Sequence, residues 1–363
     1  MKLAFAFLCF LLSSTFMLFA QDEKTDFYKF GKELKEKAKE NVNSIGHKIN
    51  EIDTSYVEPN KFNYAFMLEN SNWYEYYIFE SKEENPQRLT ISPNMSYKLG
   101  AYFGWRWIFL GWSVDLSDIF GKKKLSNKKT EFGLSLYSPM IGGDVYYRKS
   151  GSNFKLRSTS GIFEDNEYPA IATDINGFSV AIKGLNAYWV FNNKKFSYPA
   201  AYSQSSNQRR SAGSFIAGFS YSQHNIKFDH NQLPAPIVAK LSDALKFKEI
   251  SYSDYSLSFG YTYNWVFAKN FLANISLAPA IAYKKSKTDS GDRILPTLKE
   301  MNLDLITRAG VVYNDSKYFV GASMVMHTYD YRTENFYLNN SFGTIRIYAG
   351  FNFNKKKFYR SKL

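Results

Sequence analysis

From about residue 60 onward, apolar and polar residues alternate with a period of two, which is typical of β-strands with two different faces. The clearest example is YSLSFGYTYNW, where one face is aromatic or aliphatic and the other is Ser, Gly, Thr and Asn. The apolar positions of this segment are Tyr255, Leu257, Phe259, Tyr261, Tyr263 and Trp265. The same alternation recurs over residues 271–283, 303–313, 318–328 and 345–353. The chain is therefore predicted to be mostly β.

Alternation alone fits a soluble sandwich as well as a membrane barrel, but two features favour the barrel. First, the polar face is built from small residues that suit a confined interior, whereas a water-facing sheet usually carries Lys and Glu. Second, the segment 255–265 has the height of a membrane: ten steps of about 3.3 Å, tilted by about 40°, span roughly 25 Å. Aromatic girdles at both membrane interfaces would also explain an aromatic content of 18%, with 28 Tyr and 32 Phe.

Connection lengths point the same way. Residues 266–270 and 314–317 read as short turns, whereas the joins over 224–251 and 283–301 are long and polar. Outer-membrane barrels alternate short periplasmic turns with long extracellular loops. We therefore predict an antiparallel transmembrane outer-membrane β-barrel of about 12 strands, within a range of roughly 10 to 14. Residues 140–210 alternate poorly, so the pattern leaves strand number and register open there.

The N-terminal region carries two further predicted elements. A basic start, an apolar run and the small residue Ala20 indicate a secretory signal peptide cleaved near Ala20. Cys9 lies inside that apolar run without small residues before it, which disfavours a lipoprotein signal, and the exported chain would contain no cysteine. Over 24–52, apolar residues recur every three or four positions among Lys and Glu, predicting an amphipathic periplasmic helix. We favour packing on the main domain over a helix lying on a membrane surface.

These elements define four predicted regions. They are a signal peptide (1–20), a periplasmic helical segment (21–53), the barrel (54–354) and a basic C-terminal tail (355–363). The formal net charge of +13 is compatible with nucleic acid or with anionic lipid, and the export signal favours lipid. The expected partners are outer-membrane lipids, including lipopolysaccharide, and the barrel-assembly machinery. We expect no nucleic acid partner, and the sequence does not identify a solute.

Several long motifs resemble domain-of-unknown-function family 4421, a family of uncharacterised Bacteroidetes-type outer-membrane β-barrel proteins. These motifs are DTSYVEPNKFNYAFMLEN (53–70), YKLGAYFGWRWIFLGWSVDL (97–116), FSYPAAYSQSSNQRRSAGS (196–214) and YSDYSLSFGYTYNWVFAKNFLANISLAPAIAYKKSK (252–287). The resemblance covers about residues 53–354. It implies export in a Gram-negative bacterium and an outer-membrane location, but it brings no assigned activity and no catalytic residues.

Candidate chemistry is sparse. The chain has 4 histidines, and only His327 falls on a predicted interior face, where we expect a lumen or rim histidine with an ordinary hydrogen bond. HNIKFDH places His224, Asp229 and His230 close together, but without a recognised ligand spacing, so a solvated loop is favoured over a metal site. No nucleophile elbow accompanies these residues. We therefore expect no catalytic residues, no metal and no cofactor.

The most informative charges lie on predicted interior faces. Asp304, Arg308 and Arg346 alternate with apolar neighbours, and a charge facing lipid would cost about 2–4 kcal/mol at the membrane midplane. Arg106 lies within LGAYFGWRWIFLGWSV (99–114), which is too long for one crossing, so a kink or turn near Gly104 is expected. We predict that these four charges form a lumen network. Its role is either structural bracing, which we favour, or an anion-favouring constriction in a pore.

The sequence thus leaves two classes of function. The leading one is a non-enzymatic barrel, acting either as a small-solute pore or as an envelope scaffold with long extracellular loops. The alternative is a membrane-embedded lipid-modifying enzyme.

Overall fold

A computed structural model describes residues 51–94, 97–105, 108–115, 130–150, 154–163, 173–286 and 301–360. The chain divides into two units, residues 1–50 and 51–363. The predicted signal peptide and nearly all of the predicted helix therefore lie outside the described residues. Glu51 and Ile52, the last residues of that predicted helix which the structure describes, are not helical. Among the described residues, no helix combines the length and the apolarity needed to cross a membrane.

The unit 51–363 is an antiparallel β-barrel of the outer-membrane type. Its described wall consists of twelve strands, in agreement with the predicted number. They are β2 (Phe62–Ser81), β4 (Tyr97–Trp105), β5 (Ile108–Asp115), β6 (Thr130–Tyr137), β7 (Ile141–Ser150), β10 (Phe178–Val190), β12 (Ala212–Phe228), β13 (Glu249–Ala268), β14 (Phe271–Ser286), β15 (Met301–Asn314), β16 (Tyr318–Arg332) and β17 (Phe336–Lys355).

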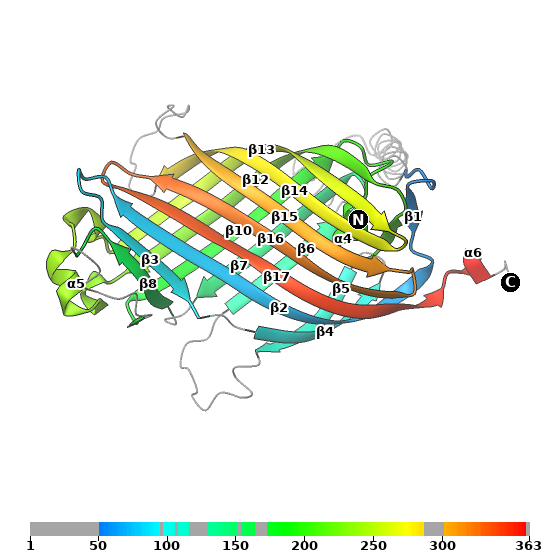
Figure 1. Cartoon of the computed structure of the whole chain (residues 1–363), viewed down its shortest axis with the longest axis horizontal. Helices are drawn as coiled ribbons and strands as arrows, with labels where there is room; N and C mark the ends of the chain where they lie inside the picture. Colours follow the sequence, from blue (N-terminus) through cyan, green and yellow to red (C-terminus); the bar gives the residue numbers. More distant parts are fainter. Residues whose placement is uncertain are drawn as a thin grey trace, which may run out of the picture. The chain divides into compact units, whose positions relative to one another are not determined.

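The described strands of this wall pair antiparallel, in the order β6-β7-β10-β12-β13-β14-β15-β16-β17-β2. The long strand β2 then has two neighbours on its other side. Its first half pairs with β4, which pairs with β5, and its second half pairs with β3 (Arg88–Pro93). Figure 1 shows the front strands crossing the rear strands, so the sheet curls around an interior. Within the described residues, β5 and β6 stand at the two ends of the ladder.

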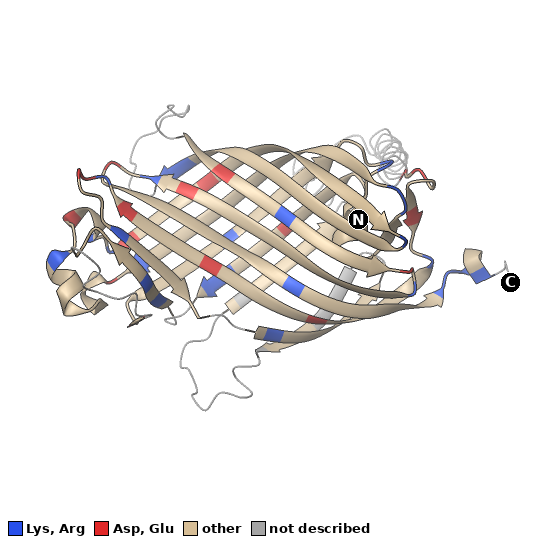
Figure 2. Ribbon diagram, in the orientation of Figure 1, with Lys and Arg blue, Asp and Glu red and all other residues tan. Residues whose placement is uncertain are grey.

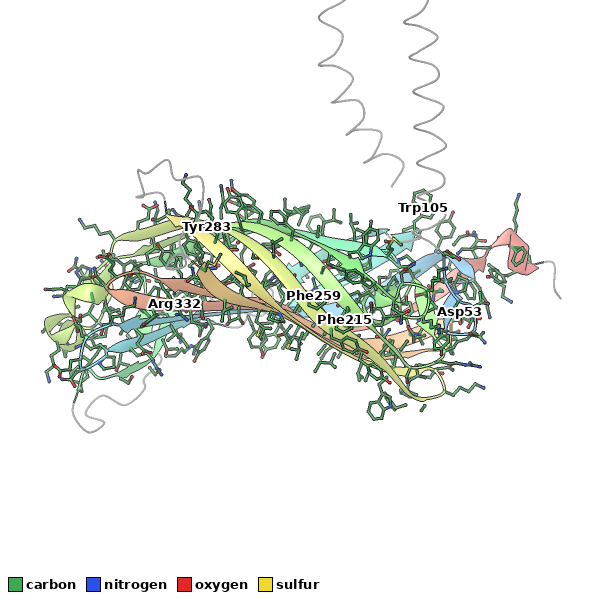
Figure 3. The ribbon with its side chains drawn as sticks, turned by 90° about the horizontal axis from the view of Figure 1, so that it is seen from above. Asp53, Trp105, Phe215, Phe259, Tyr283 and Arg332 are labelled. Atoms are coloured by element: carbon green, nitrogen blue, oxygen red, sulfur yellow. The ribbon has the colours of Figure 1, made fainter. Side chains whose placement is uncertain are left out.

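The outer face of the wall is apolar. In β13, the side chains predicted to face outward are all exposed, from Tyr255 (42%) through Leu257 (69%) to Trp265 (57%). The intervening Ser256, Thr262 and Asn264 are buried. In Figure 3, Phe215 of β12 lies beside Phe259 of β13, and their rings stack 5.5 Å apart. Figure 2 shows that most charged residues gather towards the two ends of the strands.

The two ends of the barrel differ, as the loop lengths predicted. At one end, which we call the short-turn end, two residues connect β13 to β14 and three connect β15 to β16. The opposite, long-loop end carries the connection from β12 to β13, with η1 (His230–Gln232), α5 (Ala235–Lys240) and η2 (Asp243–Leu245). There β3 also pairs with β8 (Phe154–Ser160), which pairs with β9 (Thr173–Ile175), so the sheet extends beyond the wall.

The region with poor alternation, 140–210, contains more than wall strands. Only β7 and β10 belong to the wall, while β8 and β9 lie in the extension at the long-loop end. The segment after β10 leaves the sheet and forms α4 (Tyr198–Tyr202) and β11 (Ser206–Gln208), which pairs with β1 (Val57–Pro59). Residues outside the wall do not face lipid on one side and a lumen on the other, so they show no period of two.

The tryptophan-rich stretch 99–114 is a hairpin. β4 ends at Trp105 and β5 begins at Ile108, with Trp105 paired to Ile108, so the turn lies just beyond the predicted position at Gly104. Phe103 and Trp105 are exposed at 46% and 49%, while Gly104 is buried. Arg106 lies outside the described residues. The C-terminal tail after β17 includes the short helix α6 (Lys357–Arg360).

The exposed apolar belt predicts a depth-dependent cost of charge. Phe259→Arg, near the middle of the membrane span 255–265, should lower the free energy of unfolding in lipid vesicles by about 2–4 kcal/mol, whereas Phe267→Arg beyond the end of that span should cost about 0–1 kcal/mol. Urea unfolding followed by heat-modifiable gel migration measures both values. Equal costs at the two positions would contradict a lipid-facing wall.

Candidate functional site

The lumen is the candidate site, and at the short-turn end it is filled by the chain itself. We call residues 196–208, which precede β12, the plug. All five residues of α4 are buried, as is Phe196 before it. The sequence explains a short inward helix, because Pro199 suits a first helical turn and small Ala200 and Ala201 allow close approach to the wall. This plug is part of the motif FSYPAAYSQSSNQRRSAGS.

Hydrogen bonds tie the plug to the wall on several sides. The hydroxyl groups of Tyr198 and Ser276 on β14 lie 2.6 Å apart, and the Tyr202 hydroxyl donates to Asn274 Oδ1 on the same strand. The Gln204 amide donates to the Tyr348 hydroxyl on β17 at 2.8 Å. Asn264 on β13 donates to the backbone oxygen of Ser197 at 2.9 Å. The polar inward face of these strands therefore serves to hold the plug.

Aromatic packing completes this end of the lumen. Tyr202 stacks on Tyr137 of β6 with ring centroids 5.7 Å apart, and Tyr198 meets Tyr188 of β10 edge-on at 5.3 Å. The plug thus contacts strands on opposite sides of the barrel. Such contacts leave a packed core where a pore would need a water-filled passage.

The plug is also anchored at its C-terminal side. β11 pairs with β1, and Arg209 forms an ion pair with Glu58 at 2.8 Å, while Lys61 approaches the same carboxylate. Partial burial raises the pKa of Glu58, but hydrogen bonds from Arg209 and Lys61 outweigh it, so this pKa lies below its usual value. The carboxylate therefore stays charged and holds the plug at neutral pH.

A second core fills the long-loop end of the barrel. It brings together inward side chains of the wall and side chains of β3, β8 and the β12–β13 connection. Its fully buried aromatic members include Tyr77, Phe79, Phe154, Phe178, Phe228 and Tyr252. Ile237 of α5 and Leu245 of η2 belong to the same core, as do Leu233 and Leu241, which directly follow η1 and α5. The long connection from β12 to β13 therefore forms a lid on the barrel.

Between these two cores lies a belt of buried charges. Arg308 on β15 reaches across the lumen to Asp144 on β7 at 2.6 Å, and its guanidinium lies 5.0 Å from the Tyr188 ring. The hydroxyl groups of Tyr146 on β7 and Tyr329 on β16 also meet across the lumen at 3.0 Å. These strands are not neighbours in the ladder, so the contacts hold opposite walls together.

Two further buried groups complete the belt. Lys284 on β14 is held between Asp254 on β13 and Asp304 on β15, at 2.8 Å from Asp304. Arg148 on β7 pairs with Glu75 on β2, which also accepts a hydrogen bond from Ser150 at 2.7 Å. The side chains of all three cations in the belt are 3% exposed or less. Paired burial of this kind avoids the several-kcal/mol penalty of an isolated buried charge.

A cavity of about 510 Å³ lies beside the belt. Its lining comes from β2, β4, β5, β6, β7, β16 and β17, with Tyr202 to Gln204 of the plug. Arg346 and His327 both line it. The Arg346 guanidinium is 3.9 Å from the Glu69 carboxylate, and its side chain is 23% exposed.

The predicted site residues thus lie inside the barrel but do not form one network. Asp304 pairs with Lys284, Arg308 with Asp144, and Arg346 faces Glu69. Asp304 and Arg308 both lie on β15, and each pairs with a charge on another strand. Arg106, the fourth predicted member, lies outside the described residues.

The sequence reasoning missed the partners of these charges. Asp254 and Lys284 occupy the inward positions of β13 and β14, and they are directly opposite in register. Continuing the alternation that singled out Asp304 would have identified both. Asp144 and Arg148 lie in the region of poor alternation, where the pattern gave no inward face to assign.

His224 differs from expectation in its location, and His327 lacks at Nδ1 the ordinary hydrogen bond expected for it. His224 is not in a solvated loop, because β12 continues to Phe228 and buries it. Its imidazole lies 2.8 Å from the Ser222 hydroxyl and stacks on Tyr252 at 4.6 Å. His327 is buried, stacked on Phe342, and its Nδ1 has no hydrogen-bond partner. Within the described ranges, no group of three His, Cys, Asp or Glu residues is arranged to hold a metal.

The lysine between two carboxylates gives a stability prediction. Lys284→Met leaves Asp254 and Asp304 buried without a cation, and loss of one partner from a buried ion pair costs about 3–5 kcal/mol. The triple variant Lys284→Met, Asp254→Asn, Asp304→Asn should recover most of that loss, because it removes the uncompensated charges. Urea unfolding in vesicles compares them. A single variant as stable as wild type would contradict this account of the belt.

Comparison with known proteins places this barrel in a family. No curated protein matches the chain. Among solved structures, it is similar to the outer membrane protease OmpT from Escherichia coli, with 9% identity, 83% of this chain and 100% of that chain covered, and a TM-score of 0.34. It is also similar to an outer membrane channel from Pseudomonas putida F1, with 9% identity, coverage of 81% and 97%, and a TM-score of 0.30. Similarities at this level assign neither activity to this chain.

The model of a domain of unknown function, DUF4421, matches residues 51–353, and the chain belongs to that family.

Proposed function

We propose that this chain is a non-enzymatic outer-membrane scaffold whose lumen is occluded, rather than an open pore for small solutes. The observation that carries the proposal is the plug, which packs against wall strands on opposite sides of the barrel. In the outer membrane, the short-turn end would face the periplasm and the long-loop end the exterior.

Three layers of contacts support occlusion. The plug fills the short-turn end, the belt joins β7 to β15 and β16 across the middle, and the aromatic core closes the long-loop end. A water-filled channel needs a continuous polar passage, whereas large buried aromatic side chains occupy both ends of this lumen. The long-loop end then offers a stable surface of β3, β8 and α5 for contacts outside the cell.

The alternative of a lipid-modifying enzyme finds less support. The Ser222 hydroxyl lies within hydrogen-bond distance of His224, which resembles a nucleophile with its base. Ser222 is 0% exposed and His224 is 2% exposed, and neither lines the cavity. A substrate would have to displace the packed core to reach Ser222 and His224, so their hydrogen bond contributes to the packing of the barrel interior.

Single-channel conductance in planar bilayers tests the proposal. The purified wild-type barrel should produce no stable open-channel steps. Replacing residues 197–208 by a Gly-Ser linker of equal length removes the plug, but the core at the long-loop end still closes the lumen, so steps are expected only when residues 233–245 are replaced as well. Stable conductance by the wild-type protein would refute the occluded scaffold.

The conductance test needs a control for folding and one for the second core. Heat-modifiable migration should be retained by the linker variant, since its wall strands are unchanged. If the linker variant folds but stays silent, a second variant that also replaces residues 233–245 should open the barrel. Silence of that folded double variant would show that neither plug nor lid closes the lumen.

A further inference from the structure

Towards the long-loop end, the outer face of the wall changes from apolar to polar along a row of tyrosines. Tyr221 on β12, Tyr255 on β13 and Tyr283 on β14 lie directly opposite one another in register. Their ring centroids are 4.9 Å apart for the first pair and 6.4 Å for the second. Figure 3 shows Tyr283 towards the long-loop end, with Phe259 between it and Trp105. A tyrosine row in this position matches the aromatic girdle at one membrane surface.

Directly beyond the tyrosines, the next outward position of each strand is polar. On four neighbouring strands these positions lie opposite one another and carry a cation, an amide, a hydroxyl and a second cation. In order around the wall, they are Lys183 (β10), Gln223 (β12), Ser253 (β13) and Lys285 (β14). We call these four residues the polar row. Neighbouring strands are about 4.8 Å apart, so the two lysines stand about 14 Å apart at the backbone.

The polar row belongs to a basic face. Lys183 and Lys285 are exposed, and neither forms an ion pair with any residue that the structure describes. Lys149 on β7 is a third exposed cation, diagonal to Lys183 on the neighbouring strand. Among the described outward residues beyond the tyrosines on β7, β10, β12, β13 and β14, Glu249 is the one acidic side chain, and it lies opposite Lys227. This face therefore has an excess of positive charge.

Strands β16, β17 and β2 carry no such excess at the same end. Glu80 on β2 forms an ion pair with Arg88 at 2.5 Å. Asp330 on β16 accepts a hydrogen bond from Asn339 at 2.6 Å, and it precedes the exposed Arg332 by two positions. Two acidic side chains thus accompany two arginines there. The basic face is confined to one side of the barrel, as expected of a binding surface rather than of strand ends in general.

From this arrangement we propose that the basic face binds the headgroup of a phosphorylated glycolipid in the exterior leaflet. Ammonium groups bind phosphate as point charges, so Lys183 and Lys285 each bind a phosphate. Gln223 and Ser253 bind sugar hydroxyls between them, and the acyl chains run over the tyrosine row and the apolar outer face. This gives the lipopolysaccharide expected from the sequence a defined site. The site rests on the proposed orientation, with the long-loop end outward, and not on occlusion of the lumen.

The composition of the polar row favours a large headgroup over that of a phospholipid. A single phosphate would require both lysines to lean inward over Gln223 and Ser253. Two phosphates on one sugar headgroup let each lysine bind separately and leave the amide and the hydroxyl for the sugar. The Gln223 amide also donates to the Tyr221 hydroxyl, which fixes it at the boundary between headgroup and acyl chains.

Equilibrium binding of radiolabelled lipid A, a phosphorylated glycolipid, to the full-length barrel in dodecyl maltoside tests the proposal. Lipid A should bind saturably. The double variant Lys183→Gln, Lys285→Gln should weaken binding about thirtyfold, since one lysine near an anionic lipid surface contributes about fivefold. The matched control is Lys82→Gln, Arg332→Gln, which removes two exposed cations at the same end but outside the basic face (Figure 3), and it should bind as wild type does.

A charge-retaining variant separates binding from folding. Lys183→Arg, Lys285→Arg keeps both cations and should retain most of the affinity. All variants should keep heat-modifiable migration, because the replaced side chains are exposed. Unchanged binding by the folded Lys183→Gln, Lys285→Gln variant would overturn the site. An equal loss in the Lys82→Gln, Arg332→Gln control would overturn it as well, because it would show a general effect of charge.

Two competitors test the class of lipid. Dephosphorylated lipid A has the sugars and chains without the phosphates, and phosphatidylglycerol has a phosphate without the sugars, so neither should displace lipid A efficiently. Equal competition by the first would overturn the phosphate contacts, and equal competition by the second would overturn the glycolipid.

The leaflet is tested separately, because a micelle has no sides. On whole cells, a maleimide that cannot cross membranes should label Lys240→Cys, an exposed position on α5 at the long-loop end. Absence of labelling in cells, with labelling after lysis, would overturn the exterior leaflet. Conductance by the wild-type barrel would refute the occluded lumen and leave lipid A binding unchanged.

Discussion

The structure depends on one constraint: a wall whose outer face is apolar must place its polar side chains inside. Along β13 this is visible residue by residue, from exposed Leu257 and Phe259 to buried Ser256 and Thr262. The antiparallel ladder satisfies the backbone, so side chains decide which face meets lipid. Every charge in the middle of a strand must then find a partner in a confined interior.

That constraint accounts for the contents of the lumen. Asp304 and Arg308 are inward by alternation, and each pairs with a charge from another strand, Lys284 or Asp144. Small inward residues such as Ser276 and Asn274 leave room that the plug occupies, and their polar atoms bind its tyrosines. Arg346 differs from these charges, because its ion pair with Glu69 spans 3.9 Å and its side chain lines the cavity.

The sequence predicted the wall well and the interior poorly, for a physical reason. Alternation reports which face of a strand a residue occupies, and it therefore located β13 to β17 and the inward direction of Arg308. Alternation carries no information about contacts between strands that are far apart in the ladder, so it could not predict the ion pair between Arg308 and Asp144. The motif around Tyr198 indicated the family resemblance but not that this segment fills the lumen. A segment inside the barrel has no side facing lipid, so its apolar residues do not alternate with a period of two. For His224, the prediction of a loop was wrong, since the end of β12 carries too few outward apolar residues to extend the pattern.

Cysteine accessibility tests the filled lumen most directly, because the only cysteine of the chain, Cys9, lies in the predicted signal peptide. Ala200 is 1% exposed in the centre of the plug. With Ala200→Cys in a barrel folded in vesicles, we predict no reaction with a water-soluble maleimide until urea unfolds the protein. Rapid labelling of the folded barrel at that position would show an open lumen and contradict the account.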